Sequence, residues 1–410
     1  MPKKDNIIVG LDIGTTKISA VVGEVTGGDI HVVGFGTSPS VGLRKGVVVN
    51  IESTVESIKK AVEEAEMMAG CEISAVYAGI AGSHIMGLNS RGIVAIKGRE
   101  VNPSDVERVK EAARAVAIPL DREVIHVLPQ EYLVDDQSGI TNPVGMSGVR
   151  LEAKIHIVTG AVSSVHNIIK CANRSGLDVF DIVLESMASG EAVLSEAEKD
   201  QGVVLIDIGG GTSDMAIFSG KNIRHTYVLP LGGNNLTNDI AIGIRAPLAE
   251  AEMIKKTYGT CISEGITPEE MITIQGSSGR KPRTLPRQIL AEILEMRMAE
   301  IFRLLRKEIL RAGMDDVVSA GSGIVITGGS AMLDGAVEAA ESVFSLPVRV
   351  GHPQGISGLV DVVNNPMHAT GVGLVLYGAR HQHNRKFHVK DKNIFSRIFR
   401  RMEKWFRDAV

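Results

Sequence analysis

The sequence is poor in cysteine and has no apolar run long enough to cross a membrane. Cys71, Cys171 and Cys261 are far apart and form no Cys-x-x-Cys pair, which argues against a disulfide framework and against a thiolate metal site. A transmembrane helix needs roughly 20 apolar residues, and the apolar run that ends at Asp12 is too short even for the core of a secretion signal. We therefore expect a protein of the reducing cytoplasm that is neither exported nor transmembrane.

Several catalytic signatures are also missing. The 11 histidines are scattered, without the His-Glu-x-x-His spacing of a zinc protease. No complete Walker A, Gly-x-Ser-x-Gly or Gly-x-Gly-x-x-Gly motif is present. What remains is a globular composition, 44% apolar and 22% charged, in a chain of 410 residues that is long enough for two or three domains.

The net charge of −4 hides a basic C-terminal segment. Residues 381–410 hold nine basic and three acidic side chains, whereas the rest of the chain is acidic. Only 4% of all residues are aromatic, yet this segment contains four phenylalanines and the single tryptophan, Trp405. An acidic body is a poor partner for nucleic acid, while the basic segment favours an anionic surface.

Strand-like and helix-like segments alternate along the chain, which predicts an α/β fold. The strand-like segments are rich in Val and Ile and include residues 7–13, 30–36, 74–80, 155–159, 203–208 and 324–327, and helix-like patterns cover residues 53–70 and 102–117. One motif occurs twice, because IVGLDIGTT from Ile8 is echoed by VVLIDIGGGT from Val203, and a second strand-like run follows each copy. We predict two related lobes that each open with a hairpin.

Both copies of the repeated motif contain a turn suited to phosphate. A strand that ends in Asp-x-Gly and runs into small residues exposes successive backbone N–H groups, which can bind phosphate oxygens. If the two turns face each other they can hold one nucleotide, with Asp12 and Asp207 binding a hydrated Mg²⁺ ion and Lys17 reaching the β- or γ-phosphate. A third turn, Gly328-Gly329-Ser330, follows another predicted strand. Each turn alone is also an ordinary use of Asp and Gly, but the three together favour a nucleotide site.

Five segments in this order resemble the signature of the actin-like ATPase superfamily. They are DIGTTK from Asp12, LESMASGEAVL from Leu184, DIGGGTSD from Asp207, ITGGSAML from Ile326 and MHATGVGLVLYG from Met367. The resemblance implies an α/β, actin-like two-lobed fold of duplicated ribonuclease-H-like domains with ATP and Mg²⁺ as cofactors. The first and third segments would then bind phosphate, the second and fifth would form hinge helices, and the fourth would contact adenosine.

The same resemblance implies a set of nucleotide-binding residues. They are Asp12, Gly14, Thr15, Thr16, Lys17, Asp207, Gly209, Gly210, Gly211, Thr212, Glu252, Lys255, Gly328, Gly329, Ser330 and Met332. Glu252 and Lys255 would contact the adenine and ribose, although on the residues alone they are equally an ordinary exposed helix pair. For hydrolysis the superfamily positions a water with a Gln or Glu near the first hinge helix, where this sequence has Glu185, a residue that the helix dipole also explains. We expect tight ATP binding with slow turnover.

Within the superfamily, the sequence most resembles the FtsA family of bacterial cell-division proteins. The segments that carry this resemblance are IVGLDIGTTKISAVVGE from Ile8, SRGIVAI from Ser90, LPLGGNNLTNDIAIGI from Leu229, the AEMIKKTYG helix from Ala251, and the basic aromatic tail. It implies a protein that tethers polymers of FtsZ to the cytoplasmic face of the inner membrane at the division site, self-associates into filaments and meets other division proteins. The expected organisation is a first lobe in residues 1–82 and 161–200 with an inserted subdomain in 83–160, a second lobe in 201–258 and 323–378 with an insertion in 259–322, a linker in 379–393 and an amphipathic helix in 394–407.

The tail has the pattern of a membrane-surface helix. On a helix, the large apolar side chains of residues 394–407 fall within an arc of roughly 140°, and the basic side chains lie opposite. The expected membrane-binding residues are Ile394, Phe395, Arg397, Ile398, Phe399, Arg400, Arg401, Met402, Lys404, Trp405 and Phe406. The same face would also suit docking on the body or on a partner's groove. A role in nucleic-acid binding is disfavoured because the aromatics are segregated from the charges. The resemblance to FtsA favours anionic lipids.

A second basic region lies in the second-lobe insertion. Residues 280–311 hold nine basic and four acidic side chains, and they include a predicted helix from a cap at Thr284, beside Pro286, to Gly313. A solvated helix face would explain this charge. The resemblance instead implies a site here for the acidic, hydrophobic C-terminal peptide of FtsZ. The candidate residues are Arg280, Lys281, Arg283 and Arg287.

Three other functions remain open from the residues. A small-molecule kinase of the same superfamily would have no use for the anchor. A heat-shock chaperone would need a substrate domain, and only 32 residues follow Gly378. A PilM-like platform protein of pilus assembly is closer, but the amphipathic tail argues against it.

Overall fold

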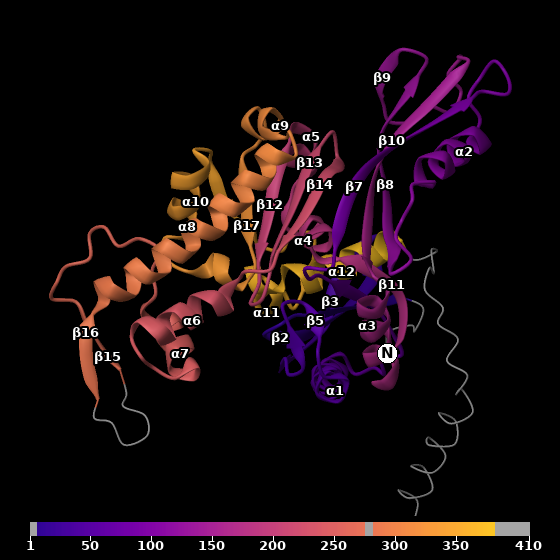
Figure 1. The fold of residues 1–410 in the computed structure, drawn as a ribbon. Coiled ribbons are helices and arrows are strands. Elements are labelled where there is room, and N and C mark those ends of the chain that lie inside the picture. Colours follow the sequence, from indigo (N-terminus) through magenta and orange to yellow (C-terminus); the bar gives the residue numbers. More distant parts are fainter. Residues whose placement is uncertain (1–5, 275–281, 382–410) are drawn as a thin grey trace, which may run out of the picture.

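Two β-sheets form the centre of the molecule (Figure 1), in a computed structural model that describes residues 6–274 and 282–381. The first sheet has the order β11-β6-β1-β2-β3-β19 and the second has the order β14-β13-β12-β17-β18. The strands of the first sheet are β1 (Ile7–Ile13), β2 (Lys17–Thr26), β3 (Asp29–Pro39), β6 (Ala75–Ile80), β11 (Asp178–Leu184) and β19 (Ser357–Gly358). Those of the second are β12 (Val203–Ile208), β13 (Ser213–Ser219), β14 (Asn222–Leu229), β17 (Ile324–Thr327) and β18 (Val348–Val350).

The two sheets share one topology, which confirms the predicted pair of related lobes. Each begins with an antiparallel meander, β1-β2-β3 or β12-β13-β14, and then adds parallel strands beside the first strand of the meander. The repeated Val- and Ile-rich runs form these strands because both faces are covered, and every residue of β12 is buried. The fold is therefore of the expected actin-like α/β class.

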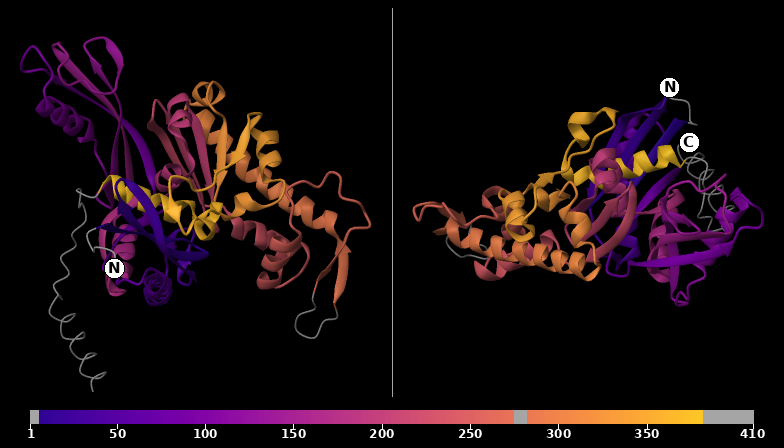
Figure 2. Two further views of the ribbon diagram at one scale, coloured as in Figure 1. Left: turned by 180° about the vertical axis from the view of Figure 1, so that it is seen from behind. Right: turned by 90° about the horizontal axis from the view of Figure 1, so that it is seen from above.

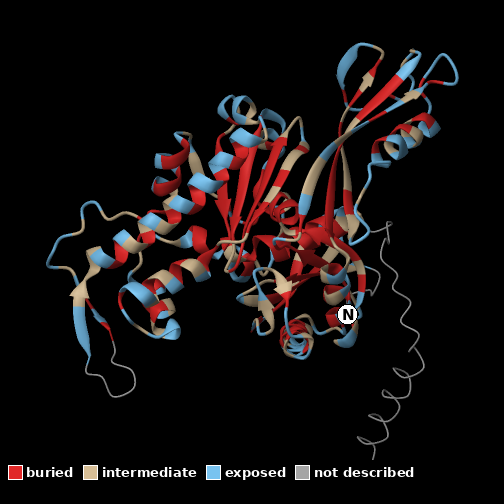
Figure 3. Ribbon diagram, in the orientation of Figure 1, coloured by how far each residue is buried: buried red, intermediate tan, exposed pale blue. Residues whose placement is uncertain are grey.

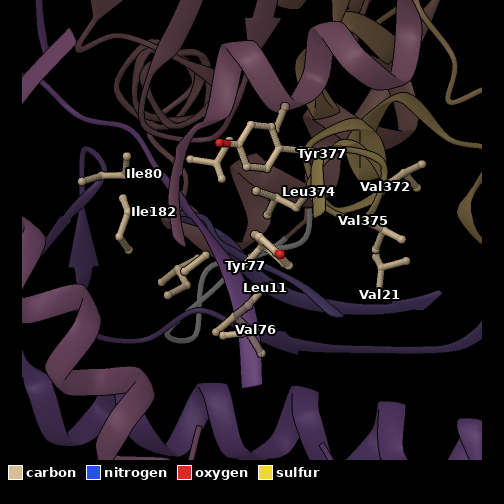
Figure 4. Close-up of a cluster of buried hydrophobic side chains, with 14 of the residues drawn as sticks. Leu11, Val21, Val76, Tyr77, Ile80, Ile182, Val372, Leu374, Val375 and Tyr377 are labelled. Atoms are coloured by element: carbon tan, nitrogen blue, oxygen red, sulfur yellow. The ribbon is translucent and has the colours of Figure 1, made fainter. Parts of the chain in front are cut away.

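Two helices cross between the lobes, α4 (Glu185–Val193) and α12 (Ala369–Arg380). Helix α12 comes after the second lobe but packs on β1 of the first, where Figure 4 places Val375 beside Val21 and Leu374 near Leu11. The hydroxyl of Tyr377, in α12, donates to Asp181 Oδ2 at 2.9 Å. The chain passes twice through the junction between the lobes, once in α4 and once in α12.

The outer face of the first sheet is covered by α1 (Ile51–Ala69) and α3 (Val162–Arg174).

Gly373 makes the close crossing of α4 and α12 possible. A Cβ atom at this position would lie 1.8 Å from the backbone oxygen of Ala188. We expect Gly373→Ala to lower the free energy of unfolding by about 1–3 kcal/mol, because the helices must separate to accept the methyl group. Chemical denaturation followed by circular dichroism measures this loss. Gly98→Ala is the control, since its Cβ would meet nothing closer than 3.9 Å, and equal stability of both variants would contradict the expectation.

The inserted subdomain has its own four-stranded sheet, β7-β10-β8-β9, and its own small core. Its elements are β7 (Met86–Ala95), α2 (Pro103–Arg114), β8 (Arg122–Val134), β9 (Gln137–Ile140) and β10 (Arg150–Ala161). Helix α2 starts with a capping box in which Asn102 accepts from Asp105 N–H and the Asp105 carboxylate accepts from Asn102 N–H. Figure 2 shows that this subdomain and the hairpin of the second insertion project from opposite ends of the molecule.

Polar side chains join the inserted subdomain to strand β14 of the second lobe. Gln130 Nε2 donates to the backbone oxygens of Ile223 and Arg224 at 3.1 and 2.9 Å, so it covers the free edge of β14. His156, fully buried, lies 2.8 Å from Thr226 Oγ1 through Nε2. Burial, with a contribution from His225, lowers the pKa of His156 to about 4. The contact is therefore built from neutral hydrogen-bonding groups.

The second-lobe insertion contains a hairpin and a long helix, and one prediction about that helix is wrong. The insertion contains β15 (Met271–Ile274), β16 (Arg283–Pro286) and α8 (Arg287–Arg311), and it follows α6 (Gly233–Gly243) and α7 (Leu248–Tyr258) of the second lobe. Thr284 does not cap the helix, because it pairs with Thr273 inside the hairpin. The helix begins after Pro286 with no side-chain cap, and it ends before Gly313 at φ +67°, close to the predicted stop.

Short elements complete the described part of the chain. They are β4 (Leu43–Arg44), β5 (Val47–Val48), α5 (Glu196–Gln201), α9 (Asp315–Ser319), η2 (Gly329–Met332), α10 (Ala336–Phe344), α11 (Val360–Val363) and η3 (Pro366–His368). Figure 3 shows that the two central sheets and the crossing helices are mostly buried, while exposed residues gather on the two projecting parts. Across residues 6–274 and 282–381, no helix is both long enough and apolar enough to traverse a bilayer.

Candidate functional site

The two glycine turns of the repeated motif touch each other. The first lies between β1 and β2 and the second between β12 and β13. A Cβ atom on Gly210 would lie 1.8 Å from Thr16 Oγ1, and one on Gly211 would lie 2.6 Å from Thr15 Oγ1. Thr15 Oγ1 also accepts a hydrogen bond of 3.0 Å from the N–H of Gly46. Only glycine lets the second turn approach the threonines of the first so closely.

Two further segments join the second turn. Gly328, with φ +85°, packs so tightly that a Cβ would lie 2.3 Å from Asp207 Oδ1, and Ser330 Oγ lies 3.5 Å from the backbone oxygen of Gly209. At the start of α6, the N–H groups of Gly233 and Asn234 donate to the oxygens of Gly209 and Gly210, at 2.9 and 2.7 Å. The third predicted turn therefore belongs to the same site. The Gly232-Gly233 segment was not among the predicted residues, although its paired glycines after a strand were a usable signal.

Asp12 and Asp207 are both buried at the bases of their turns. Lys17 Nζ and Ser19 Oγ donate to Asp12 Oδ2 at 3.3 and 3.4 Å. Asp207 Oδ2 accepts from Ser189 Oγ at 2.5 Å. Burial raises the pKa of Asp207, the Ser189 hydrogen bond opposes this, and the charge of Asp12 adds to the rise.

Glu185, the first residue of α4, belongs to this acidic group. Burial raises its pKa well above the usual value, and the charges of Asp12, Asp214 and Asp207 raise it further, while Lys17 opposes them. Its environment therefore disfavours the ionised form of the carboxyl.

Asp214 is a site residue that the sequence prediction missed. Burial raises its pKa to about 8, with Asp207 adding to the shift, and its Oδ1 is buried without a hydrogen-bond partner. The predicted hairpin was a usable signal for Asp214. Asp214 and Asp207 are directly opposed in the β12-β13 hairpin, and cross-strand partners lie on one face of a sheet.

The described residues contain no group of three or more His, Cys, Asp or Glu side chains arranged to hold a metal ion. Two converging carboxylates nevertheless suit a Mg²⁺ ion that keeps its waters and is held mainly by phosphate oxygens. The Mg²⁺ assignment to Asp12 and Asp207 stays a prediction.

Glu252 and Lys255 do not form the exposed helix pair that the residues alone allowed. Lys255 is buried in α7, and its Nζ donates to Gly233 O at 3.1 Å and to Thr237 Oγ1 at 2.8 Å and pairs with Glu252 at 2.7 Å. Burial lowers the pKa of Lys255, and Glu252 opposes that shift. Burial alone would raise the pKa of Glu252, but hydrogen bonds from Lys255 and Thr237 lower it. The pair thus supports the segment that contacts Gly209.

The remaining predicted residues are less closely gathered. Met332, at the end of η2, is 47% exposed. Arg287 donates to Glu270 at 2.9 Å and to the Tyr258 oxygen at 3.0 Å, on the outer end of the second insertion. Arg283 donates to the oxygen of Ile244 and lines a groove of about 340 Å³. Arg280 and Lys281, and all predicted membrane residues from Ile394 to Phe406, lie outside the described residues.

Comparison with known proteins gives both structural neighbours and close relatives. The PilM–PilN complex of type IV pilus biogenesis has a TM-score of 0.66 and 18% identity, with 91% of this chain and 98% of that chain covered. MreB5 of Spiroplasma citri bound to ADP has a TM-score of 0.58 and 16% identity, covering 92% and 98%. The cell division protein FtsA of Pseudomonas aeruginosa is 55% identical over 92% of this chain and 90% of its own length. That of Escherichia coli K12 is 40% identical over 98% and 97%.

Two related lobes, crossed helices between them and facing glycine turns define a protein of the actin-like class. A family described as "Cell division protein FtsA" matches residues 204–373, and an "SHS2 domain inserted in FTSA" matches residues 82–159. With relatives this similar over nearly the whole length, the chain belongs to the FtsA family of cell-division proteins. The likeness to PilM concerns the fold alone.

Proposed function

We propose that the chain binds Mg²⁺·ATP between its lobes and, in that state, links FtsZ polymers to the cytoplasmic face of the inner membrane at the division site. The observation that carries the nucleotide part is the contact of the Gly210-Gly211 backbone with Thr15 and Thr16. The two turns come from different lobes and lie side by side. A phosphate chain that binds to their N–H groups would therefore be held by both lobes. The solved structure of MreB5 with ADP, which has this fold, supports the proposal.

Calorimetric titration of ATP into the purified chain with Mg²⁺ tests the nucleotide part. We expect uptake of one nucleotide per chain, with weaker binding when Mg²⁺ is removed by EDTA, since the carboxylates would then face the phosphates without a cation between them. The absence of any binding heat at millimolar ATP would remove this proposal.

The roles proposed for the residues follow from their positions. Residues 14–16 and 209–212 would bind phosphate through backbone N–H groups, and Lys17 would leave Asp12 for a phosphate oxygen. Asp12 and Asp207 would hold Mg²⁺ through water. Residues 328–330 and Met332 would contact the adenosine, with Glu252 and Lys255 at the adenine and ribose. Lys17 Nζ lies 3.3 Å from Asp12 Oδ2, so both side chains belong to the same end of the first turn.

Slow hydrolysis is expected because the raised pKa of Glu185 favours its protonated form. A protonated carboxyl cannot accept a proton from the attacking water, so turnover should rise as increasing pH deprotonates it. We expect phosphate release to increase with pH and, at the upper end of the pH range, to be about tenfold or more slower in Glu185→Ala than in the wild type. Glu191→Ala, in the same helix, is the control. An unaltered rate and pH profile in Glu185→Ala would remove this residue from the mechanism.

Membrane attachment is assigned to the tail. The linker, residues 379–393, would separate the body from an amphipathic helix at 394–407 that lies on anionic lipids. Residues 394–407 are too few to span a bilayer, which agrees with a peripheral protein. Filament formation, with the inserted subdomain at residues 83–160 as one contact surface, would place many such tails on one membrane and strengthen attachment through effective concentration. Other division proteins would join this assembly.

The FtsZ peptide is assigned to the groove beside Arg283. This groove of about 340 Å³ is lined by Arg245 and Arg283 together with apolar side chains that include Leu285 and Ile289. Basic and apolar side chains that line one groove suit an acidic and hydrophobic peptide. Arg287, already paired with Glu270, is the least available of the four predicted residues.

A peptide titration tests this assignment. Replacement of Arg280, Lys281, Arg283 and Arg287 by alanine should weaken binding of the FtsZ C-terminal peptide about tenfold or more, because each lost charge-assisted bond contributes roughly 1.5–3 kcal/mol. The matched control removes Arg303 and Lys307, which line a second basic groove of about 410 Å³ between α8 and α10. If only this control loses affinity, the peptide binds between α8 and α10 instead.

A further inference from the structure

Two hydroxyl groups from the crossing helices meet the carboxylate of Asp207. Ser189, in α4, donates to Oδ2 at 2.5 Å, and Thr370, at the start of α12, donates to the same oxygen at 3.1 Å. The two hydroxyl oxygens are 3.0 Å apart. Ser189 is fully buried and Thr370 and Asp207 are nearly so. Three residues far apart in the sequence therefore form one closed polar cluster.

The cluster has fewer hydroxyl protons than close oxygen–oxygen contacts. Each hydroxyl has one proton, so Ser189 and Thr370 can together donate two hydrogen bonds, while three close contacts are present. When Thr370 turns its proton to Ser189, Oδ2 keeps one donor, and when it turns to Asp207, Oδ2 has two. Both hydroxyls contact Oδ2, whereas Oδ1 packs against Gly328 of the third glycine turn.

The three residues of the cluster belong to different parts of the molecule, namely the second lobe and the two crossing helices. Asp207 is the last residue but one of β12 in the second lobe, and α12 packs against β1 of the first lobe. Helices α4 and α12 are locked to each other where Gly373 meets Ala188. A shift of one lobe against the other must therefore either move Asp207 with the helices or break its hydroxyl contacts.

We infer that Ser189 and Thr370 are positioning residues that hold the Asp207 carboxylate beside the glycine turns and join the nucleotide site to the helices between the lobes. This inference rests on the proposed binding of Mg²⁺·ATP. Neither hydroxyl would touch the nucleotide, and both act through Asp207. The cluster would sense the cation together with its phosphates, because positive charge near the Asp207 carboxylate would change how strongly Oδ2 attracts the two donors.

The test compares ATP affinity with Mg²⁺ and with EDTA in the full chain. We expect Ser189→Ala and Thr370→Val to shrink the ratio of the two dissociation constants about tenfold, since hydrogen bonds to a charged group are at stake. Thr370→Ser keeps the hydroxyl and should keep the wild-type ratio. Circular dichroism establishes that each variant is folded. A merely structural role would change stability and leave the ratio unchanged.

The outcomes separate this inference from the function on which it rests. Absence of ATP binding by the wild-type chain would overturn both. Binding with a wild-type Mg²⁺ ratio in folded Thr370→Val and Ser189→Ala would overturn the positioning role alone. Loss of the ratio in Thr370→Ser as well as in Thr370→Val would also overturn it, because the hydroxyl would then not be the group that matters.

Discussion

Gly210→Ala is expected to weaken ATP binding about 10- to 100-fold. The added Cβ would lie 1.8 Å from Thr16 Oγ1, so the two turns must move apart. Their N–H groups could then no longer bind the same phosphate chain. Overpacking of this kind costs roughly 1–3 kcal/mol, and each 1.4 kcal/mol corresponds to about a tenfold change in affinity. Calorimetry with Mg²⁺·ATP measures the loss directly.

A second substitution makes this expectation specific. In the Gly210→Ala chain, Thr16→Ala removes the oxygen that the new methyl group would meet, so it should restore part of the affinity. Thr16→Ala alone gives the reference for the cost of the lost hydroxyl, which completes a double-mutant cycle. If Gly210→Ala binds ATP as the wild type does, or if the two losses simply add, the contact between the turns is not part of the nucleotide site.

Removal of the tail after His383 is expected to abolish sedimentation with anionic vesicles. Half-burying the seven large apolar side chains of residues 394–407 contributes roughly 5–10 kcal/mol, and each nearby basic side chain adds about 1 kcal/mol. Ordering the helix costs about 1 kcal/mol per residue, so a single tail should bind reversibly and several tails firmly. Co-sedimentation with vesicles of phosphatidylglycerol and phosphatidylcholine measures the difference.

The control keeps the tail and changes only its apolar face. Phe399→Asp with Trp405→Asp places two carboxylates among the apolar side chains, and it should reduce sedimentation nearly as much as truncation does. Vesicles of phosphatidylcholine alone test the charge contribution. Undiminished sedimentation of the truncated chain would assign membrane attachment to the body of the protein.

The sequence was most informative where local patterns repeat. The two copies of the Asp-Ile-Gly motif predicted related lobes, because a buried strand followed by a tight turn is specified by neighbouring residues. It was least informative at chain segments whose structure depends on distant partners. Thr284 had the local pattern of a helix cap, but pairing with Thr273 placed it in a hairpin. Lys255 had the pattern of an exposed helix residue, but contacts with Gly233 and Thr237 buried it.

By itself the sequence determined the glycine turns, the repeated strands, the family resemblance and the amphipathic pattern of the tail, since each depends on residues close together in the chain. Only the tertiary structure decided that the turns touch, that Asp214 joins the acidic group and that Asp207 meets Ser189 and Thr370. Ser189 and Thr370, whose hydroxyl oxygens lie 3.0 Å apart, are separated by 181 positions in the sequence. No local periodicity encodes such contacts, because they depend on how the two lobes pack around α4 and α12.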